Sequence, residues 1–317
     1  MSDPKVSVLV PCFRSERFLA TALDSVRAQT LASWECVVVD NASPDGTFAL
    51  AERYAAQDPR IRAHRNAENL GPVRNWRRCA ELAGETQYAA LLFSDDWYEP
   101  AFLERAVALL DADPGVGIVY SAVRLAPAPD APKAVGPARV MYALDGPAVR
   151  PAADYLEIAY DARGRQVPRS PCCAVARRAD LARWLSLALP GEERLGYLRH
   201  GAGPDQAVYL QAALEYPRLG HLAEPLVCFS AHGGNLTWRP DVELGYASVL
   251  AHFYEAHAAR MPFGRARVPA KLASRLIELG AVDEGRRLRN RLGPLGWVMY
   301  AKEARNRRRR ARRRLTP

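Results

Sequence analysis

Two adjacent carboxylates are the residues whose type and spacing most directly suggest chemistry. Asp95 and Asp96 follow the apolar run 88–93, and Asp40 follows a second apolar run, 35–39. Adjacent carboxylates repel each other unless a cation or hydrogen-bond donors compensate their charge. Mg²⁺ and Mn²⁺ prefer oxygen ligands and can also bridge a diphosphate. The pair therefore predicts a metal site, and capping of the helix that follows is the alternative that the sequence leaves open.

The elements that must position these carboxylates alternate through the first 125 residues. Apolar runs predict strands over 6–10, 35–39, 61–64, 88–93 and 116–121, and helical spacing predicts helices over 18–30, 48–56, 73–83 and 100–110. This alternation favours an α/β domain with a mostly parallel sheet. Ligands of such sheets bind beyond the carboxyl ends of the strands, where Asp40 and the Asp95–Asp96 pair stand. Asp40 could there contact a nucleobase or ribose, or simply belong to the loop.

The second half of the chain is less regular. Six prolines between 126 and 151 predict a loop or weak hairpin that covers one side of the site. We expect helices over 153–160, 178–187, 205–215, 252–260 and 272–279, and a strand over 219–230. The fold class is thus α/β, with a helical C-terminal region.

Three stretches, in this order and spacing, resemble the family 2 glycosyltransferases, whose GT-A fold binds nucleotide-diphospho-sugars. They are VSVLVPCFRSERFLATALDSVRAQTLASWECVVVDNASPDGT at 6–47, NAENLGPVRNW at 66–76 and LLFSDDWYEP at 91–100. The resemblance covers roughly residues 5–125. It implies transfer of a sugar from a UDP- or TDP-linked donor to an acceptor hydroxyl with inversion, in polysaccharide or other glycoconjugate biosynthesis. It also implies a catalytic domain over 1–235, with a donor half (1–125) and an acceptor half (126–235), a helical extension over 236–300 and a basic tail over 301–317.

The resemblance also assigns roles in the donor half. Donor nucleotide-binding residues would be Pro11, Phe13, Asp40, Asn69, Gly71, Asn75 and Asp95. In the motif Ser94-Asp95-Asp96, Asp95 would face the ribose and Asp96 would coordinate Mn²⁺ or Mg²⁺. The chain departs from the family pattern at two positions: Arg14 stands where Asn is frequent, and Ser94 removes one possible metal ligand.

In the acceptor half the resemblance implies a carboxylate near a helix start that deprotonates the acceptor. Asp205, in Gly203-Pro204-Asp205-Gln206, is our candidate for this catalytic base, with first-turn capping as its alternative role. Other carboxylates that could serve are Glu192, Glu193 and Asp180. His232 precedes two glycines that allow close backbone approach. We expect it to join the metal or to contact the diphosphate, and a structural role is the alternative.

Net charge is concentrated at the C-terminus. Of the net +9, residues 302–317 carry +8, so the remainder is close to neutral and predicts no specific nucleic-acid partner. The basic tail follows an apolar-aromatic segment at 294–300, which suits an anionic membrane surface; a solvated tail is the alternative. We find no run long enough to span a bilayer and no secretion signal. We therefore expect a cytoplasmic protein, either free or peripheral at the inner face of the cell membrane.

Two other features argue against rival functions. None of the six cysteines forms a CxxC pair, which argues against a disulfide framework or zinc site. The segment 11–15 lacks the glycine-rich loop with lysine expected of a nucleotidyltransferase. A non-catalytic nucleotide-binding scaffold, or a protein that binds nucleic acid or membrane through its tail, remains the alternative function.

Overall fold

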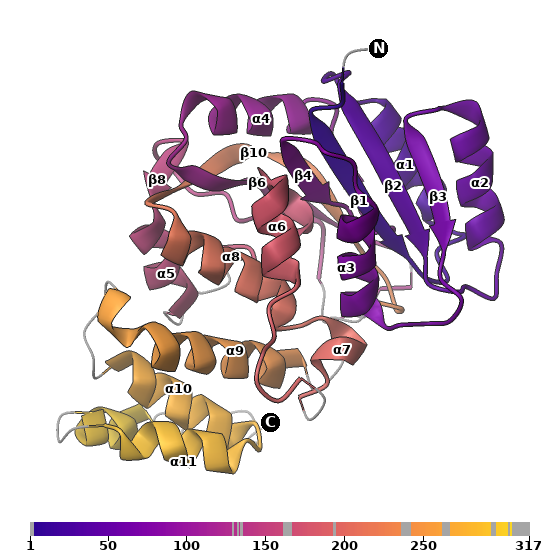
Figure 1. Cartoon of the computed structure of the whole chain (residues 1–317). Helices are drawn as coiled ribbons and strands as arrows, with labels where there is room; N and C mark the ends of the chain where they lie inside the picture. The colour runs from indigo at the N-terminus through magenta and orange to yellow at the C-terminus, as the bar shows by residue number, and fades with distance from the viewer. Residues whose placement is uncertain are drawn as a thin grey trace.

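The structure is a computed structural model of the chain. It describes residues 3–128, 130, 131, 133, 136–160, 167–192, 195–235, 242–261, 267–292, 296–303 and 305. Figure 1 shows a sheet flanked by helices, with further helices stacked below it toward the C-terminus. The α/β fold with a helical C-terminal region that the sequence predicted is confirmed.

The donor half is built on four parallel strands in the order β3-β2-β1-β4. These strands are β1 (Val6–Cys12), β2 (Trp34–Asp40), β3 (Ile61–Arg65) and β4 (Tyr88–Leu91). Every residue of β1 is buried, and β2 has one position that is only partly so. Continuous apolar runs form such strands because helices cover both faces of the sheet. The helices between them are α1 (Leu19–Arg27), α2 (Thr47–Gln57) and α3 (Pro72–Leu82).

Beyond β4 the sheet becomes mixed. Its order continues β4-β9-β6-β10-β5, and β9 runs antiparallel to both of its neighbours. The added strands are β5 (Trp97–Tyr98), β6 (Val116–Pro127), β9 (Ala174–Arg177) and β10 (Arg218–Ala231). The sequence did not predict β9, because its four residues are too few for a clear periodic pattern. The parallel pairing that the sequence predicted holds for the first four strands and for β6 with β10.

The proline-rich segment forms two short strands. β7 (Arg139–Met141) pairs with β6, and β8 (Val149–Pro151) pairs with β10, both antiparallel. The predicted weak hairpin is therefore split between two partners. Helices pack around this half of the sheet: α4 (Phe102–Ala112), α5 (Ala152–Tyr160), α6 (Arg178–Leu185), α7 (Tyr197–His200) and α8 (Pro204–Glu215), with the short helix η3 (Pro171–Cys173).

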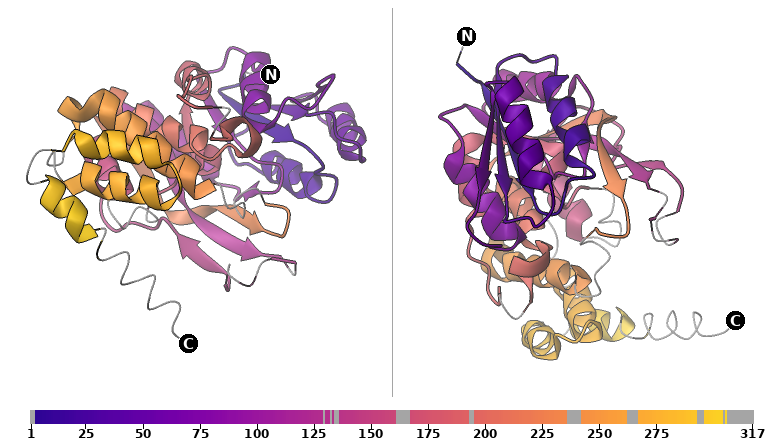
Figure 2. Two further views of the ribbon diagram at one scale, coloured as in Figure 1. Left: turned by 90° about the horizontal axis from the view of Figure 1, so that it is seen from below. Right: turned by 90° about the vertical axis from the view of Figure 1, so that its right-hand side faces the viewer.

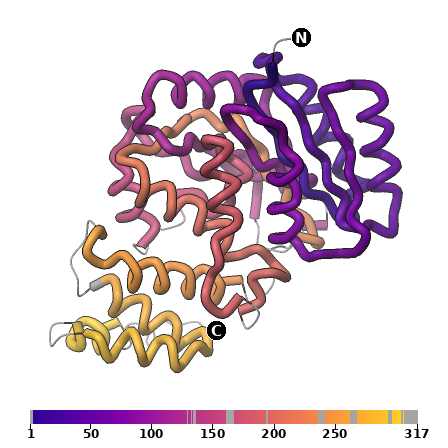
Figure 3. The backbone as a smooth tube through the Cα atoms, viewed as in Figure 1, coloured from indigo at the N-terminus to yellow at the C-terminus, as the bar shows by residue number. Residues whose placement is uncertain are grey.

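The C-terminal helices form a layer of their own. They are α9 (Val242–His257), α10 (Arg267–Glu278) and α11 (Val282–Asn290), joined by the short η5 (Ala258–Arg260), and α9 packs on α8. Figures 2 and 3 show this layer lying against the end of the sheet domain that is farthest from the N-terminus. The sequence missed α11, whose charged composition gives little apolar signal. Within the described residues, no helix is long and apolar enough to cross a membrane.

Candidate active site

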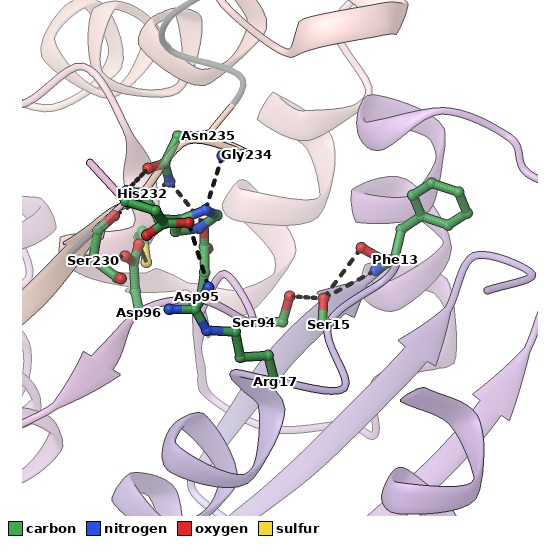
Figure 4. Close-up of polar contacts among 12 residues, drawn as sticks. Phe13, Ser15, Arg17, Ser94, Asp95, Asp96, Ser230, His232, Gly234 and Asn235 are labelled. Atoms are coloured by element: carbon green, nitrogen blue, oxygen red, sulfur yellow. Dashed lines mark hydrogen bonds and ion pairs between the residues drawn. The ribbon is translucent and has the colours of Figure 1, made fainter. Parts of the chain in front are cut away.

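The turn after β4 holds the paired carboxylates. Ser94 Oγ lies 2.7 Å from Ser15 Oγ, and Ser15 N–H donates to Thr47 Oγ1 at 2.8 Å, so the turn is tied to the loop after β1 (Figure 4). Asp96 N–H donates to the carbonyl of Phe93 at 3.0 Å. These contacts fix a tight turn, in which two successive side chains point to different surroundings.

Asp96 points into the protein. One carboxylate oxygen accepts the Ser230 N–H at 2.9 Å, and the other accepts the Cys172 thiol at 3.2 Å. Burial, and next the charge of Asp95, raise the pKa of Asp96 well above its usual range. Both oxygens are used inside the fold, so Asp96 joins β10 and η3 to the turn.

Asp95 points outward, with 26% of its side chain exposed. Its Oδ2 lies 3.1 Å from His232 Nε2 and accepts the Asn235 amide at 2.9 Å (Figure 4). The imidazole of His232 stacks on Phe18 at 4.4 Å, and its Nδ1 accepts the Gly234 N–H. In the neutral ring the proton therefore sits on Nε2 and faces Asp95. Sequence reasoning missed Asn235, which has no strand-end signal.

The metal assignment made from the sequence, Asp96 with His232, does not match this geometry. The described contacts bring His232 to Asp95 and direct Asp96 to Cys172 and Ser230. The physical reason is that the turn separates the two neighbours, and only tertiary contacts decide which one faces solvent. The histidine and a carboxylate do meet, but the carboxylate is the preceding residue.

Phe13 and Asp40 lie at the same edge of the sheet, since β1 and β2 pair Cys12 with Asp40. Phe13 is 40% exposed, so its ring is available for stacking. Asp40 is fully buried, accepts the Ser43 N–H and lies 3.3 Å from Arg65 Nε. Pro11 is buried within β1, where it shapes the strand end.

Arg14 occupies a position where the backbone is left-handed, with φ of +53°. Its N–H donates to Ser43 Oγ at 2.9 Å, and its guanidinium lies 5.5 Å from the Phe13 ring centre. Asn tolerates this region better than Arg, which gives a physical reason for the frequent Asn in the family.

Asn69, Gly71 and Asn75 belong to a polar network that shapes the loop before α3. Asn41 donates to Asn69 Oδ1 at 2.9 Å, and Asn75 donates to the Val39 carbonyl at 3.0 Å. Asn66 links the two parts, with contacts to Asn41 and Asn75. At Gly71, φ is +79° and a Cβ would lie 2.6 Å from the Leu198 carbonyl, so only glycine fits. These three residues contact one another and the backbone, and the sequence missed Asn41 and Asn66.

Asp205 begins α8 as a buried carboxyl. Its Oδ1 accepts the N–H groups of Gly203 (2.8 Å) and Gln206 (2.7 Å), and its Oδ2 accepts the Tyr246 hydroxyl (2.7 Å). Burial raises the pKa of Asp205 to about 7, although the hydrogen bonds and the charge of Arg169 oppose the rise. A carboxyl with a pKa near neutrality suits proton transfer. Asp205 thus accepts N–H groups at the start of α8, as a capping residue does, and also has a pKa near neutrality.

The other carboxylates considered as bases are engaged elsewhere. Glu192 pairs with Arg77 of α3 at 3.0 Å. Asp180 pairs with Arg183 at 2.6 Å and accepts the Tyr216 hydroxyl. Glu193 lies outside the described residues. Of these described candidates, only Asp205 is buried.

A short segment connects Asp205 to the Asp95–Asp96 turn. The guanidinium of Arg169 lies 4.4 Å from the ring of Tyr246, which donates to Asp205. Three residues later, Cys172 donates to Asp96. Arg169 and Cys172, three residues apart, thus link the surroundings of Asp205 to Asp96.

Asp95 is the more exposed carboxylate of the pair. Among the described residues, no group of three or more His, Cys, Asp or Glu side chains could hold a metal ion. Mg²⁺ and related ions are commonly bound through one or two carboxylates together with substrate phosphates, at about 2.1 Å, so neighbouring ligands lie about 3 Å apart. Asp95, with His232 beside it, would hold such a cation together with substrate phosphates.

Parts of the chain are similar in sequence to known glycosyltransferases. Residues 7–139 match the family model described as "Glycosyl transferase family 2". A putative glycosyltransferase of Bacillus subtilis, EpsH, is 37% identical over 106 residues, which cover 33% of this chain and 30% of that protein. The putative teichuronic acid biosynthesis glycosyltransferase TuaG of the same organism is 31% identical over 107 residues, covering 34% of this chain and 42% of that protein. The chain thus matches less than half the length of these two relatives.

Two solved structures share the fold over most of this chain. Staphylococcus aureus TarS 1–349, in complex with UDP-GlcNAc, has a TM-score of 0.64 at 18% identity, covering 94% of this chain and 79% of that one. The mannosyltransferase PcManGT from Pyrobaculum calidifontis, in complex with GDP-Man and Mn²⁺, has a TM-score of 0.53 at 19% identity, covering 95% and 80%. The fold is therefore that of the GT-A glycosyltransferases. Residues 7–139, less than half of the chain, are similar to glycosyltransferase family 2.

Proposed function

We propose that the protein transfers a sugar from a nucleoside-diphosphate sugar to an acceptor hydroxyl with inversion. One observation carries the proposal: a partly exposed Asp95 lies beside His232, and a buried Asp205 with a pKa of about 7 is linked to the neighbouring Asp96 through Tyr246 and the segment 169–172. Asp95 suits binding of a cation and the donor diphosphate, and Asp205 suits proton transfer. The family match over the donor half supports the same reaction.

The donor lies across the carboxyl ends of β1, β2 and β4 in this proposal. The nucleobase of the donor stacks on the ring of Phe13, near Asp40 at the same edge of the sheet. The diphosphate of the donor lies at Asp95. UDP and TDP are the donor nucleotides expected, and TarS, whose fold is similar, binds UDP-GlcNAc. Asp40 is fully buried beside Arg65. Donor binding therefore has to shift Arg65 before the Asp40 carboxylate can contact the nucleobase.

The transfer is a single displacement. The acceptor oxygen forms a bond to the anomeric carbon on the side opposite the leaving group, and its proton passes to Asp205 Oδ2. The bond between the anomeric carbon and the phosphate oxygen breaks, and its electron pair leaves with the nucleoside diphosphate. The attack from the opposite side inverts the anomeric carbon, through an oxocarbenium-like transition state.

Asp95 is the residue that we assign to the metal, in place of Asp96. Bound there, Mn²⁺ or Mg²⁺ supplies positive charge that stabilises the departing diphosphate. His232 stands beside it, where it either shares the cation or donates to a phosphate oxygen. Asp96 holds the turn in position through its contacts with Ser230 and Cys172.

The acceptor is proposed to be part of a cell-surface polymer or other glycoconjugate, in line with the name of the relative TuaG. We also propose that the C-terminus binds anionic lipid. Trp297 and Val298 are 42% and 64% exposed, and Arg289 lies 5.0 Å from the Trp297 ring. The tail beyond residue 305 lies outside the described residues. Each basic residue near an anionic surface contributes about 1 kcal/mol.

Binding to lipid is tested by sedimentation with vesicles of phosphatidylcholine alone or with phosphatidylglycerol. The full chain is expected to sediment only with the anionic vesicles, and less so as salt increases. A chain ending at residue 301 is the matched control and is expected to remain unbound. Equal recovery of both chains would overturn the assignment, and binding to RNA in place of vesicles would favour the nucleic-acid alternative.

The transferase proposal is tested by titrating UDP and TDP into the protein by calorimetry, with and without Mn²⁺. Binding that needs the metal supports the donor site and directs a search of sugar nucleotides for release of UDP or TDP. If neither nucleotide binds the folded protein with metal present, the donor site is wrong and a scaffold role is favoured.

A further inference from the structure

The two oxygens of Asp205 have different surroundings. Oδ1 accepts two backbone N–H groups, those of Gly203 and Gln206, so it is held by the start of α8. Oδ2 accepts one hydrogen bond, from the hydroxyl of Tyr246 at 2.7 Å. Only Oδ2 has a lone pair left for a substrate hydroxyl, since a carboxylate oxygen accepts about two hydrogen bonds. The oxygen that accepts the proton of the acceptor is therefore Oδ2, which also accepts the hydrogen bond from Tyr246.

We propose that Tyr246 of α9 is a positioning residue for the base, because its hydroxyl orients Oδ2 of Asp205 and favours the ionised carboxylate. The inference rests on the proposed function, in which Asp205 is the base. It extends the active site to the C-terminal helical layer, outside the residues 7–139 that match the family. The C-terminal helices thereby act on the chemistry as well as on the fold.

The backbone brings Tyr246 close by means of Gly245. A Cβ at this position would lie 2.4 Å from the Ala202 carbonyl, so glycine lets α9 approach the loop that begins α8. Tyr197 also donates to the Gly245 carbonyl at 3.3 Å. The start of α9 is thus fixed against the residues that precede Asp205, which leaves the Tyr246 hydroxyl little freedom to move away.

Arg169 holds the ring of Tyr246 from a third segment. Its guanidinium lies 4.4 Å from the ring centre, and its Nη1 lies 3.4 Å from Glu243 Oε1 at the start of α9. The ring is therefore enclosed by the segment before η3 as well as by its own helix. A hydroxyl held in this way keeps a constant direction toward Asp205.

The groups that interact with Asp205 come from three segments besides α8. Tyr246 of α9 and Arg169 before η3 lower the pKa of Asp205, and the charge of Asp205 in turn raises the pKa of Tyr155 of α5. Burial raises the pKa of Asp205, and the Tyr246 hydrogen bond is the strongest of the opposing influences, ahead of the backbone N–H groups and the Arg169 charge. Removing the hydroxyl deletes a donor that favours the ionised form, so the pKa of Asp205 has to rise further.

The test compares Tyr246→Phe with Tyr160→Phe. Tyr160 is a buried tyrosine of α5, and its hydroxyl donates to the Leu250 carbonyl of α9. The first measurement is UDP release from UDP-N-acetylglucosamine and from UDP-glucose, with Mn²⁺ and with water as acceptor, across a range of pH. The second is ¹³C NMR titration of the Asp205 carboxyl, identified by its loss in Asp205→Asn.

Because the base works when ionised, the rate rises with pH through the pKa of Asp205. In Tyr246→Phe that rise is expected to move to higher pH, since one hydrogen bond to a charged group is worth about one pH unit or more. The rate then falls about fivefold near pH 7 and recovers near pH 9. The NMR titration shifts in the same direction, and Tyr160→Phe matches the wild type in both.

The proposal is overturned if Tyr246→Phe titrates like the wild type, or if its rate falls by one factor at every pH. Failure of the proposed function looks different. In that case the wild-type protein releases no UDP, or Asp205→Asn leaves the release unchanged. The NMR titration still decides the Tyr246 contact by itself, because it needs no turnover.

Discussion

The two carboxylate regions of the proposed active site differ in how deeply their carboxylates are buried. In the donor region Asp95 lies at a strand end, 26% exposed and beside His232 and Asn235, where water and donors surround a charge. In the base region Asp205 is buried at a helix start, where burial raises its pKa to about 7. A group that holds a cation has to remain charged, whereas a base has to change its charge during the reaction. The different degrees of burial provide these two behaviours.

The largest effect is expected from Asp205→Asn. Asn keeps an acceptor for the N–H groups of Gly203 and Gln206 but cannot accept a proton. Turnover should fall by about 10²–10⁴-fold, the usual contribution of a general base. UDP affinity with Mn²⁺ should stay unchanged in calorimetry, because the donor region is intact. A parallel loss of UDP affinity would show that the two regions are not separate.

A comparison of Asp95→Ala with Asp96→Asn tests which of the two carboxylates in the donor region binds the metal. Removing Asp95 should abolish the metal-dependent part of UDP binding and lower turnover by about 10²–10³-fold, as for other lost transition-state charge partners. Asp96→Asn keeps an acceptor for the Ser230 N–H and should retain metal-dependent binding. Calorimetry with and without Mn²⁺ measures both variants. The reverse pattern would restore Asp96 as the metal ligand.

Phe13→Ala should have a smaller effect that is independent of the metal. Its ring is 40% exposed, and stacking of a base on an aromatic ring is worth about 1–3 kcal/mol. UDP affinity is then expected to fall about fivefold at the lower end of that range, by the same factor with and without Mn²⁺. Unequal factors would mean that Phe13 and the cation do not act on separate parts of the donor.

The smallest effect concerns stability and pH. Asp205 takes up a proton at about pH 7 when folded, and an unfolded Asp does so at about pH 4. The native state thus binds more protons between these values, so this carboxyl makes the protein less stable as pH rises from about 4 to 7. Asp205→Asn should raise the melting temperature by a few degrees near pH 8 and by less near pH 5. Thermal unfolding at both pH values measures this, and an equal change at both would contradict a buried titrating carboxyl.

The predictability of the two regions also differs. The donor strands followed from apolar runs, and Asp40 and the Asp95–Asp96 turn stand at strand ends as expected. The sequence did not distinguish Asp95 from Asp96, nor did it find Asn41, Asn66 or Asn235. Their contacts join residues as far apart as 95 and 235, and no local pattern encodes such pairings.

The sequence by itself determined the order of strands and helices in the donor half and the sheet edge at which its acidic residues gather. It could do so because periodicity and strand ends are local properties. Only the tertiary structure decided that Asp95 meets His232 while Asp96 turns inward to Cys172. It alone placed Tyr246 against Asp205. Burial and hydrogen bonding between distant segments set the chemistry of a carboxylate, and the fold is what brings those segments together.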